Sequence, residues 1–139
     1  MYKVYPFAKL VSKDKLNSTP YFVVEFCPGF ENFAEKIKLY TNRIVDKNTI
    51  GYYIGYSYKN KKNKISGLLL FNNSTVNCGT FAHEALHACL GILNEQGFKL
   101  ENLKRDLKEQ EVAESSIEEV LAYMMDATLE QLEKINDKI

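Results

Sequence analysis

The two histidines of this chain lie four residues apart, in the sequence His83-Glu84-Ala85-Leu86-His87. On an α-helix, side chains four residues apart lie on one face, so both imidazoles can reach the same metal ion. Neutral imidazole is a good zinc ligand, and a site with three protein ligands keeps a fourth position for water. The sequence therefore predicts a Zn2+ site with His83 and His87 as ligands and hydrolysis as its chemistry.

Glu84 lies directly beside this histidine pair in the sequence. A carboxylate next to a metal-activated water can take its proton and later pass that proton to the leaving group. We therefore predict Glu84 as the general base. The alternative is a helix that carries two histidines for packing alone.

The third protein ligand cannot be a histidine, because the chain has only two. The segment 117–129 is apolar nearly all round, so we expect it to be buried on more than one side. A buried carboxylate is costly unless it is paired or binds a metal. We predict Glu119 as the third ligand, Glu118 as the second choice and Asp126 as a residue that orients a ligating histidine. The alternative for Glu119 is a solvated residue that continues the preceding acidic run.

Alternation and helical spacing predict the elements that position these residues. Side-chain oxygens at Asn72-Asn73-Ser74-Thr75 suit a helix start, and the segment 98–111 fits either a helix or a loop. The predicted elements are strands near 1–11 and 21–26, a helix over 30–40, an antiparallel hairpin of 49–58 and 65–71, a buried helix from about Val76 to Leu93 ending near Gly97, and a long helix from about Val112 to Ile135.

With 139 residues, the chain predicts a single domain, 1–139. Its 18 basic and 18 acidic side chains predict no nucleic-acid partner, since no net charge attracts a polyanion. No apolar run approaches the roughly 20 residues of a membrane span, which predicts no membrane partner. Three cysteines at irregular spacings do not indicate a disulfide framework, and the N-terminus lacks the pattern of a signal peptide. We expect a soluble, cytoplasmic protein.

The sequence His83–His87 resembles the zinc-binding helix of zincin metallopeptidases. A Glu on a later helix, followed three residues on by a small residue, is typical of the gluzincin branch, and Glu119 with Ala122 is similar to that pattern. Tyr123 stands where thermolysin-like enzymes have an Asp that orients a histidine. The pair of helices also resembles small metallopeptidases of phages and prophages and mobile-element peptidases that cleave repressors. The resemblance covers about 68–132.

The resemblance implies a compact α+β zincin-like fold, a small and mostly antiparallel sheet with the metal helix and the Glu helix beside it. It implies cleavage of peptide bonds in a protein or peptide substrate. An alternative within enzymes is cleavage of one specific protein, such as a repressor. In zincins, an edge strand before the metal helix pairs with the substrate, and Ile65–Phe71 occupies that place in the sequence. Tyr123 is the first choice as donor to the scissile carbonyl, ahead of the hairpin tyrosines. The alternative function is a non-catalytic metal-binding interaction module.

Overall fold

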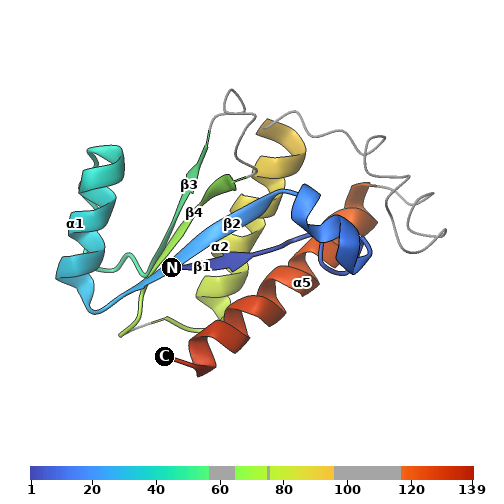
Figure 1. Ribbon diagram of the computed structural model, residues 1–139. Coiled ribbons are helices and arrows are strands. Elements are labelled where there is room, and N and C mark those ends of the chain that lie inside the picture. Colours follow the sequence, from blue (N-terminus) through green and yellow to red (C-terminus); the bar gives the residue numbers. More distant parts are fainter. Residues whose placement is uncertain (57–64, 75, 96–116) are drawn as a thin grey trace.

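The computed structural model describes residues 1–56, 65–74, 76–95 and 117–139. These residues form a mixed α+β fold with one four-stranded sheet (Figure 1). The elements in chain order are β1 (Tyr2–Val4), the 3-10 helix η1 (Lys13–Ser18), β2 (Tyr21–Cys27), α1 (Phe30–Thr41), β3 (Gly51–Gly55), β4 (Ile65–Asn72), α2 (Cys78–Leu90), the π-helical turn η2 (Gly91–Glu95) and α5 (Ile117–Asp137).

The strand order in the sheet is β1-β2-β4-β3. The β1/β2 and β3/β4 pairs are antiparallel, whereas β2 and β4 are parallel, so the sheet is mixed. The predicted hairpin is confirmed, with Gly51 opposite Phe71 and Gly55 opposite Gly67. The prediction that 65–71 is an edge strand is wrong, because β4 lies between β2 and β3. Among the described strands, β3 is the edge on that side.

Helices cover the two faces of the sheet in separate layers (Figure 1). Successive side chains of a strand point to opposite faces. Leu68 and Leu70 of β4 pack with Phe33 and Ile37 of α1. Leu69 and Phe71 belong to the other cluster, which includes residues of α2 and α5. Burial on both faces is typical of a central strand with a parallel neighbour and accounts for the apolar run in β4.

Helix α1 forms where its spacing of apolar residues predicts a helix. The backbone of Gly29 precedes the helix with a φ of 88°, a conformation that glycine adopts without a Cβ clash. The helix ends at Asn42, whose φ of 59° is left-handed and whose N–H donates to the carbonyl of Lys38. The predicted strand before it is also confirmed, since β2 spans 21–27.

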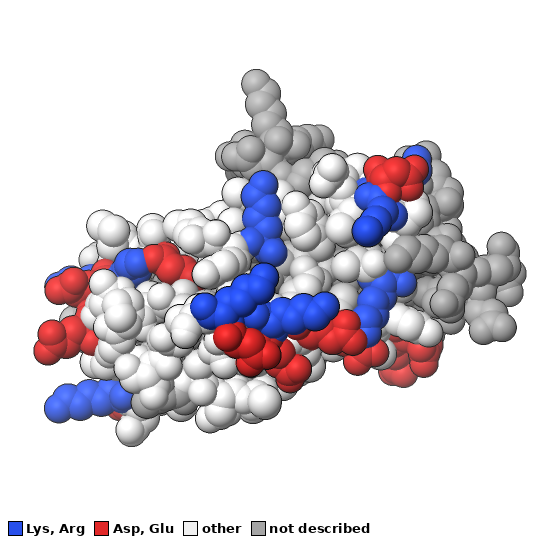
Figure 2. All heavy atoms as spheres, turned by 60° about the horizontal axis from the view of Figure 1, so that its bottom comes forward, with Lys and Arg blue, Asp and Glu red and all other residues white. Residues whose placement is uncertain are grey.

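The N-terminal segment is held against α5 by polar contacts. Gln131 bonds both backbone groups of Tyr5, because its Oε1 accepts from the N–H and its Nε2 donates to the carbonyl, each at 2.8 Å. Lys9 Nζ lies 2.6 Å from Glu130 Oε1 on the surface. On the face in Figure 2, basic and acidic side chains lie next to one another. The predicted first strand is shorter than expected, because only residues 2–4 pair with β2.

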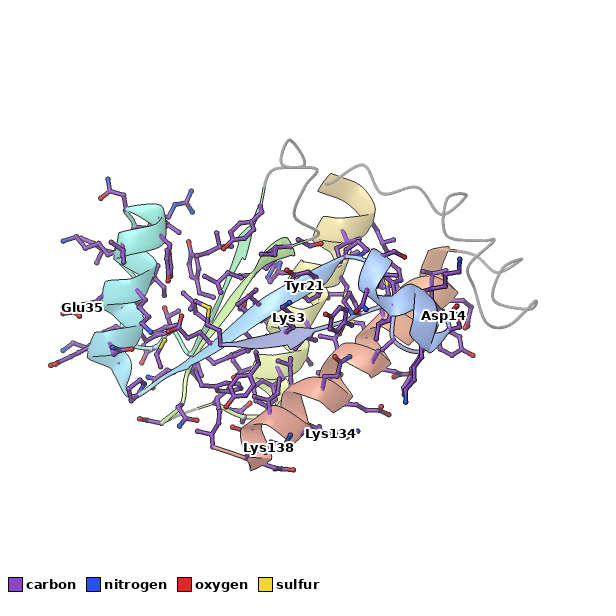
Figure 3. The ribbon with its side chains drawn as sticks, viewed as in Figure 1. Lys3, Asp14, Tyr21, Glu35, Lys134 and Lys138 are labelled. Atoms are coloured by element: carbon purple, nitrogen blue, oxygen red, sulfur yellow. The ribbon has the colours of Figure 1, made fainter. Side chains whose placement is uncertain are left out.

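The strand at the other edge of the sheet is β1, which is only three residues long. Lys3 projects from it over Tyr21 of β2, with Nζ 5.0 Å from the ring centroid (Figure 3). A short edge strand with an exposed lysine is poorly suited to pairing with another chain. This leaves β3 as the edge better suited to accept an extended peptide.

Four predicted features lie outside the described residues: the hairpin tip, the end of the buried helix near Gly97, the segment 98–111 and the start of the last helix near Val112. The rest of that helix is confirmed as α5. Among the described residues, none of the helices combines the length and the apolar character needed to cross a membrane.

Candidate metal centre

Helix α2, which carries the histidine pair, begins after Asn77. Asn77 has an extended backbone, and its Oδ1 accepts from the N–H of Thr80 at 3.0 Å, which satisfies one of the free donors at the helix start. The prediction that the cap lies at 72–75 is wrong. Asn72 instead belongs to β4, and its Oδ1 accepts from the N–H of Ser74 in the turn before the helix.

The apolar side of α2 determines where the histidines point. Phe81, Ala85, Ala88 and Cys89 are buried against the sheet and α5. Phe81 packs edge-on against Phe71 of β4, with ring centroids 5.0 Å apart. At about 100° per residue, the imidazoles lie roughly opposite this buried side.

His83 and His87 are both exposed, and their imidazoles lie together as the spacing predicts. Their Nε2 atoms are 3.3 Å apart, and the ring planes are inclined at 75°. Two nitrogens bound to one tetrahedral zinc at about 2.0–2.1 Å lie roughly 3.3–3.4 Å from each other. The pair therefore fits a shared zinc ion, and without metal one imidazole can donate a hydrogen bond to the other.

Glu84 occupies a different environment from the histidines beside it. Its side chain is only 9% exposed, compared with 69% for His83, and its Oε1 lies 3.8 Å from His83 Nε2. Burial raises the pKa of the Glu84 carboxyl above its ordinary value, while positive charge on His83 and His87 acts in the opposite direction. A carboxylate that is harder to keep ionised is a stronger base. Glu84 thus has the surroundings expected of a proton acceptor at the edge of a metal site.

Glu119 lies in the first turn of α5, where both it and Glu118 are exposed. The expectation that this face of α5 is buried is wrong, since Ala122 and Asp126 are exposed as well. A different stripe of α5 packs into the core, so the carboxylate face stays in water. The buried residues of that stripe are Val120, Met124, Ala127, Thr128, Leu132 and Ile135.

Two side-chain contacts between α2 and α5 come from the side of α2 that faces away from the imidazoles. Cys89 Sγ lies 3.7 Å from Thr128 Oγ1, and Cys78 Sγ lies 4.0 Å from Glu133 Oε1. These cysteines lie about 120–180° around the helix from the imidazoles. Within the described part of the chain, the structure gathers no group of three or more His, Cys, Asp or Glu side chains suited to a metal. Glu119 as third ligand therefore stays a prediction.

Tyr123, the predicted donor, is half-buried and packs against the core cluster that includes α2 and α5. Tyr123 as donor therefore stays a prediction.

Sequence reasoning missed Gly51, which starts the edge strand and lies against Glu84. A glycine inside a strand often marks a close approach of another part of the chain, and that signal was available in the sequence.

Comparison of the chain with protein-family models, with curated proteins and with solved structures finds no match.

Proposed function

We propose that this protein is a zinc-dependent metallopeptidase of the zincin type, in which Glu84 acts as the general base. The observation that carries the proposal is the pair of exposed imidazoles with Nε2 atoms 3.3 Å apart beside a buried carboxylate. This spacing matches what one tetrahedral zinc requires, and the buried carboxylate beside the pair supports a role for Glu84 in proton transfer. The combination of two exposed imidazoles with a buried carboxylate favours a hydrolytic metal site over two histidines that serve only in packing.

In this proposal His83 and His87 hold the metal, and Glu119 completes the ligand set. Zinc held there would supply Lewis-acid chemistry, lowering the pKa of a water and polarising the scissile carbonyl. The role of Glu84 would be to accept a proton from the attacking water and to pass it to the leaving amine. Tyr123 is proposed to donate to the carbonyl oxygen, with the hairpin tyrosines as second choice.

The proposed substrate is a protein or peptide in extended conformation. An extended peptide can add to a free sheet edge through main-chain hydrogen bonds. The edge beside Glu84 is β3, because Gly51 lies against the Glu84 side chain. We therefore assign the substrate to β3 in place of the 65–71 strand. A dedicated protein, such as a repressor encoded by a phage or mobile element, would suit so small a domain. The cytoplasm suits the three cysteines, which are free.

The test of catalysis is incubation of the zinc-loaded protein with a complex mixture of peptides, followed by mass spectrometry of the products. Cleavages that occur with wild type and are absent with Glu84→Gln support the proposal, provided that the variant retains zinc. Glutamine keeps the shape of the side chain and removes its basicity. Identical products with both proteins would exclude Glu84 as the base. For a dedicated substrate, the same pair of proteins is compared in cells for loss of one protein.

A second candidate is a non-catalytic metal-binding interaction module. Leu86, which is 42% exposed between the two histidines, favours this candidate, because an exposed apolar side chain there would belong to a partner surface. Structural zinc usually has four protein ligands, whereas catalytic zinc keeps a water position, so a site with two His and one Glu fits the peptidase better. Retained function in Glu84→Gln would point to the module.

A further inference from the structure

The first residue of the edge strand, Gly51, packs directly against the side chain of Glu84. A Cβ atom built on Gly51 would lie 2.8 Å from Glu84 Cγ, 3.0 Å from Thr80 Cγ2 and 3.2 Å from Phe71 Cδ1. Carbon atoms in contact prefer separations of about 3.5–4.0 Å, so the closest of these approaches is not tolerated without movement. The absence of a side chain at position 51 is what lets Glu84 lie against β3.

The surroundings decide which neighbour would move if a methyl group were added. Phe71 is fully buried, and its ring packs against those of Phe26 and Phe81, with centroids 5.5 and 5.0 Å away. Gly51 itself is paired with Phe71 in the sheet. Thr80 is in the first turn of α2 and is tied to the Asn77 cap. The Glu84 side chain is the neighbour that can rotate about several bonds. A methyl group at position 51 would therefore displace the Glu84 carboxylate.

We propose that Gly51 is a positioning residue for Glu84. Its missing side chain creates the space along β3 in which the Glu84 stem lies, and this keeps the carboxylate beside His83, 3.8 Å from Nε2. The catalytic meaning of this inference rests on the proposed function, whereas the contact itself does not. In this role Gly51 acts through Glu84, by leaving room for its side chain, and is not itself a catalytic residue.

The test compares Gly51→Ala with Gly55→Ala, a matched control at the other end of the same strand. A Cβ on Gly55 would meet the Tyr53 hydroxyl at 3.0 Å, the far end of a side chain, and lies away from Glu84. Because the chain has two histidines, NMR of the metal-free protein at fixed pH gives two imidazole Hε1 signals. Gly51→Ala should move the His83 signal towards its position in Glu84→Gln, while Gly55→Ala leaves it in place. A His83 signal that stays or moves the other way contradicts the proposal.

A double-mutant cycle in urea gives a second readout that needs no substrate and no metal. Gly51→Ala should lower the unfolding midpoint in the wild-type background and lower it less in Glu84→Ala, where Cγ is absent. Equal drops in both backgrounds would overturn the proposal. If Gly51→Ala does not fold, folding of the Gly51→Ala/Glu84→Ala double variant supports the proposal, and its failure to fold contradicts it.

The two proposals can fail separately in these experiments. A wild type that binds no zinc would refute the proposed function and leave the Gly51–Glu84 coupling measurable. If the function holds, Gly51→Ala should retain about one zinc per chain, because the imidazoles are untouched, and should cleave with lower kcat at unchanged KM. Loss of zinc together with activity would mean that Gly51 supports the whole site and not Glu84 in particular.

Discussion

Asn77→Ala should weaken the start of the metal helix without removing the metal. Asn77 Oδ1 accepts from the N–H of Thr80 at 3.0 Å and lies 3.3 Å from its hydroxyl. Removal of such a cap costs about 0.5–2 kcal/mol in general. Asn77 is exposed, so water replaces part of the lost bond, and we expect about 0.5–1 kcal/mol. For a chain of this length, that loss lowers Tm by roughly 2–4 °C.

The assay is thermal unfolding followed by circular dichroism, with Asn73→Ala as the control. Asn73 lies in the segment where the sequence predicts the cap, yet the structure gives that role to Asn77. Asn73→Ala should therefore lower Tm by less than Asn77→Ala. Zinc content should be unchanged in both, because His83 lies more than one turn beyond the cap. A larger drop for Asn73→Ala than for Asn77→Ala would refute the assignment of the helix start.

Two other predictions concern buried ionisable groups. Burial raises the pKa of the Glu84 carboxyl, so the folded state binds this proton more tightly than the unfolded state. The stability that results is fully present below the ordinary pKa of 4.5 and is lost as pH rises through the pKa of the folded state. The metal-free Glu84→Gln variant should therefore be more stable than wild type at pH 7. The difference should shrink as pH falls through the raised pKa of the folded state and should level off near the ordinary value of 4.5. Urea unfolding at several pH values measures this difference, and a wild type that is the more stable at pH 7 contradicts the expectation. Burial also raises the pKa of the Cys89 thiol to about 12 and raises that of Cys27, whereas Cys78 is exposed. A thiol reagent should label Cys78 quickly and the other two only after denaturation, so rapid labelling of all three would show that the packing around them is wrong.

Local pattern was enough to predict most of the elements. The spacing of Phe33 and Ile37 marks α1, and alternating or continuous apolar runs mark β2 and the β3–β4 hairpin. These features follow from the periods of helix and strand, which act within a few residues. The same local rule brings His83 and His87 together, because a turn of helix fixes their separation whatever the rest of the chain does.

Features that depend on distant parts of the chain were not predicted. The parallel pairing of β2 with β4 joins segments about 45 residues apart, and it makes β3, in place of β4, the edge of the sheet. The run Leu68–Phe71 contains the signal for a central strand, since both of its faces are apolar. Which face of α5 is exposed likewise depends on which stripe of its residues packs against the rest of the core. Glu119 could not be assigned from the pattern of its own helix.

The cap of α2 shows why a local rule can choose the wrong residue. Several polar residues precede the helix, and each has an oxygen able to accept from a free N–H. Asn72 is taken up by the strand, where it is buried, which leaves Asn77 to cap the helix. Competition between neighbouring elements decided the boundary.

Elemental analysis of the purified protein tests the central claim most directly, that one zinc ion is bound through His83 and His87. The variants are His83→Ala, Glu119→Ala and, as a matched acidic control, Glu118→Ala. We predict about one zinc per chain in wild type and Glu118→Ala, with loss of the metal in the other two. Loss of zinc in His83→Ala alone would still support the histidine pair as ligands and would exclude Glu119 as a ligand. A wild type that holds no metal after zinc is supplied would contradict the account and leave His83–His87 as a solvent-facing turn of a packed helix.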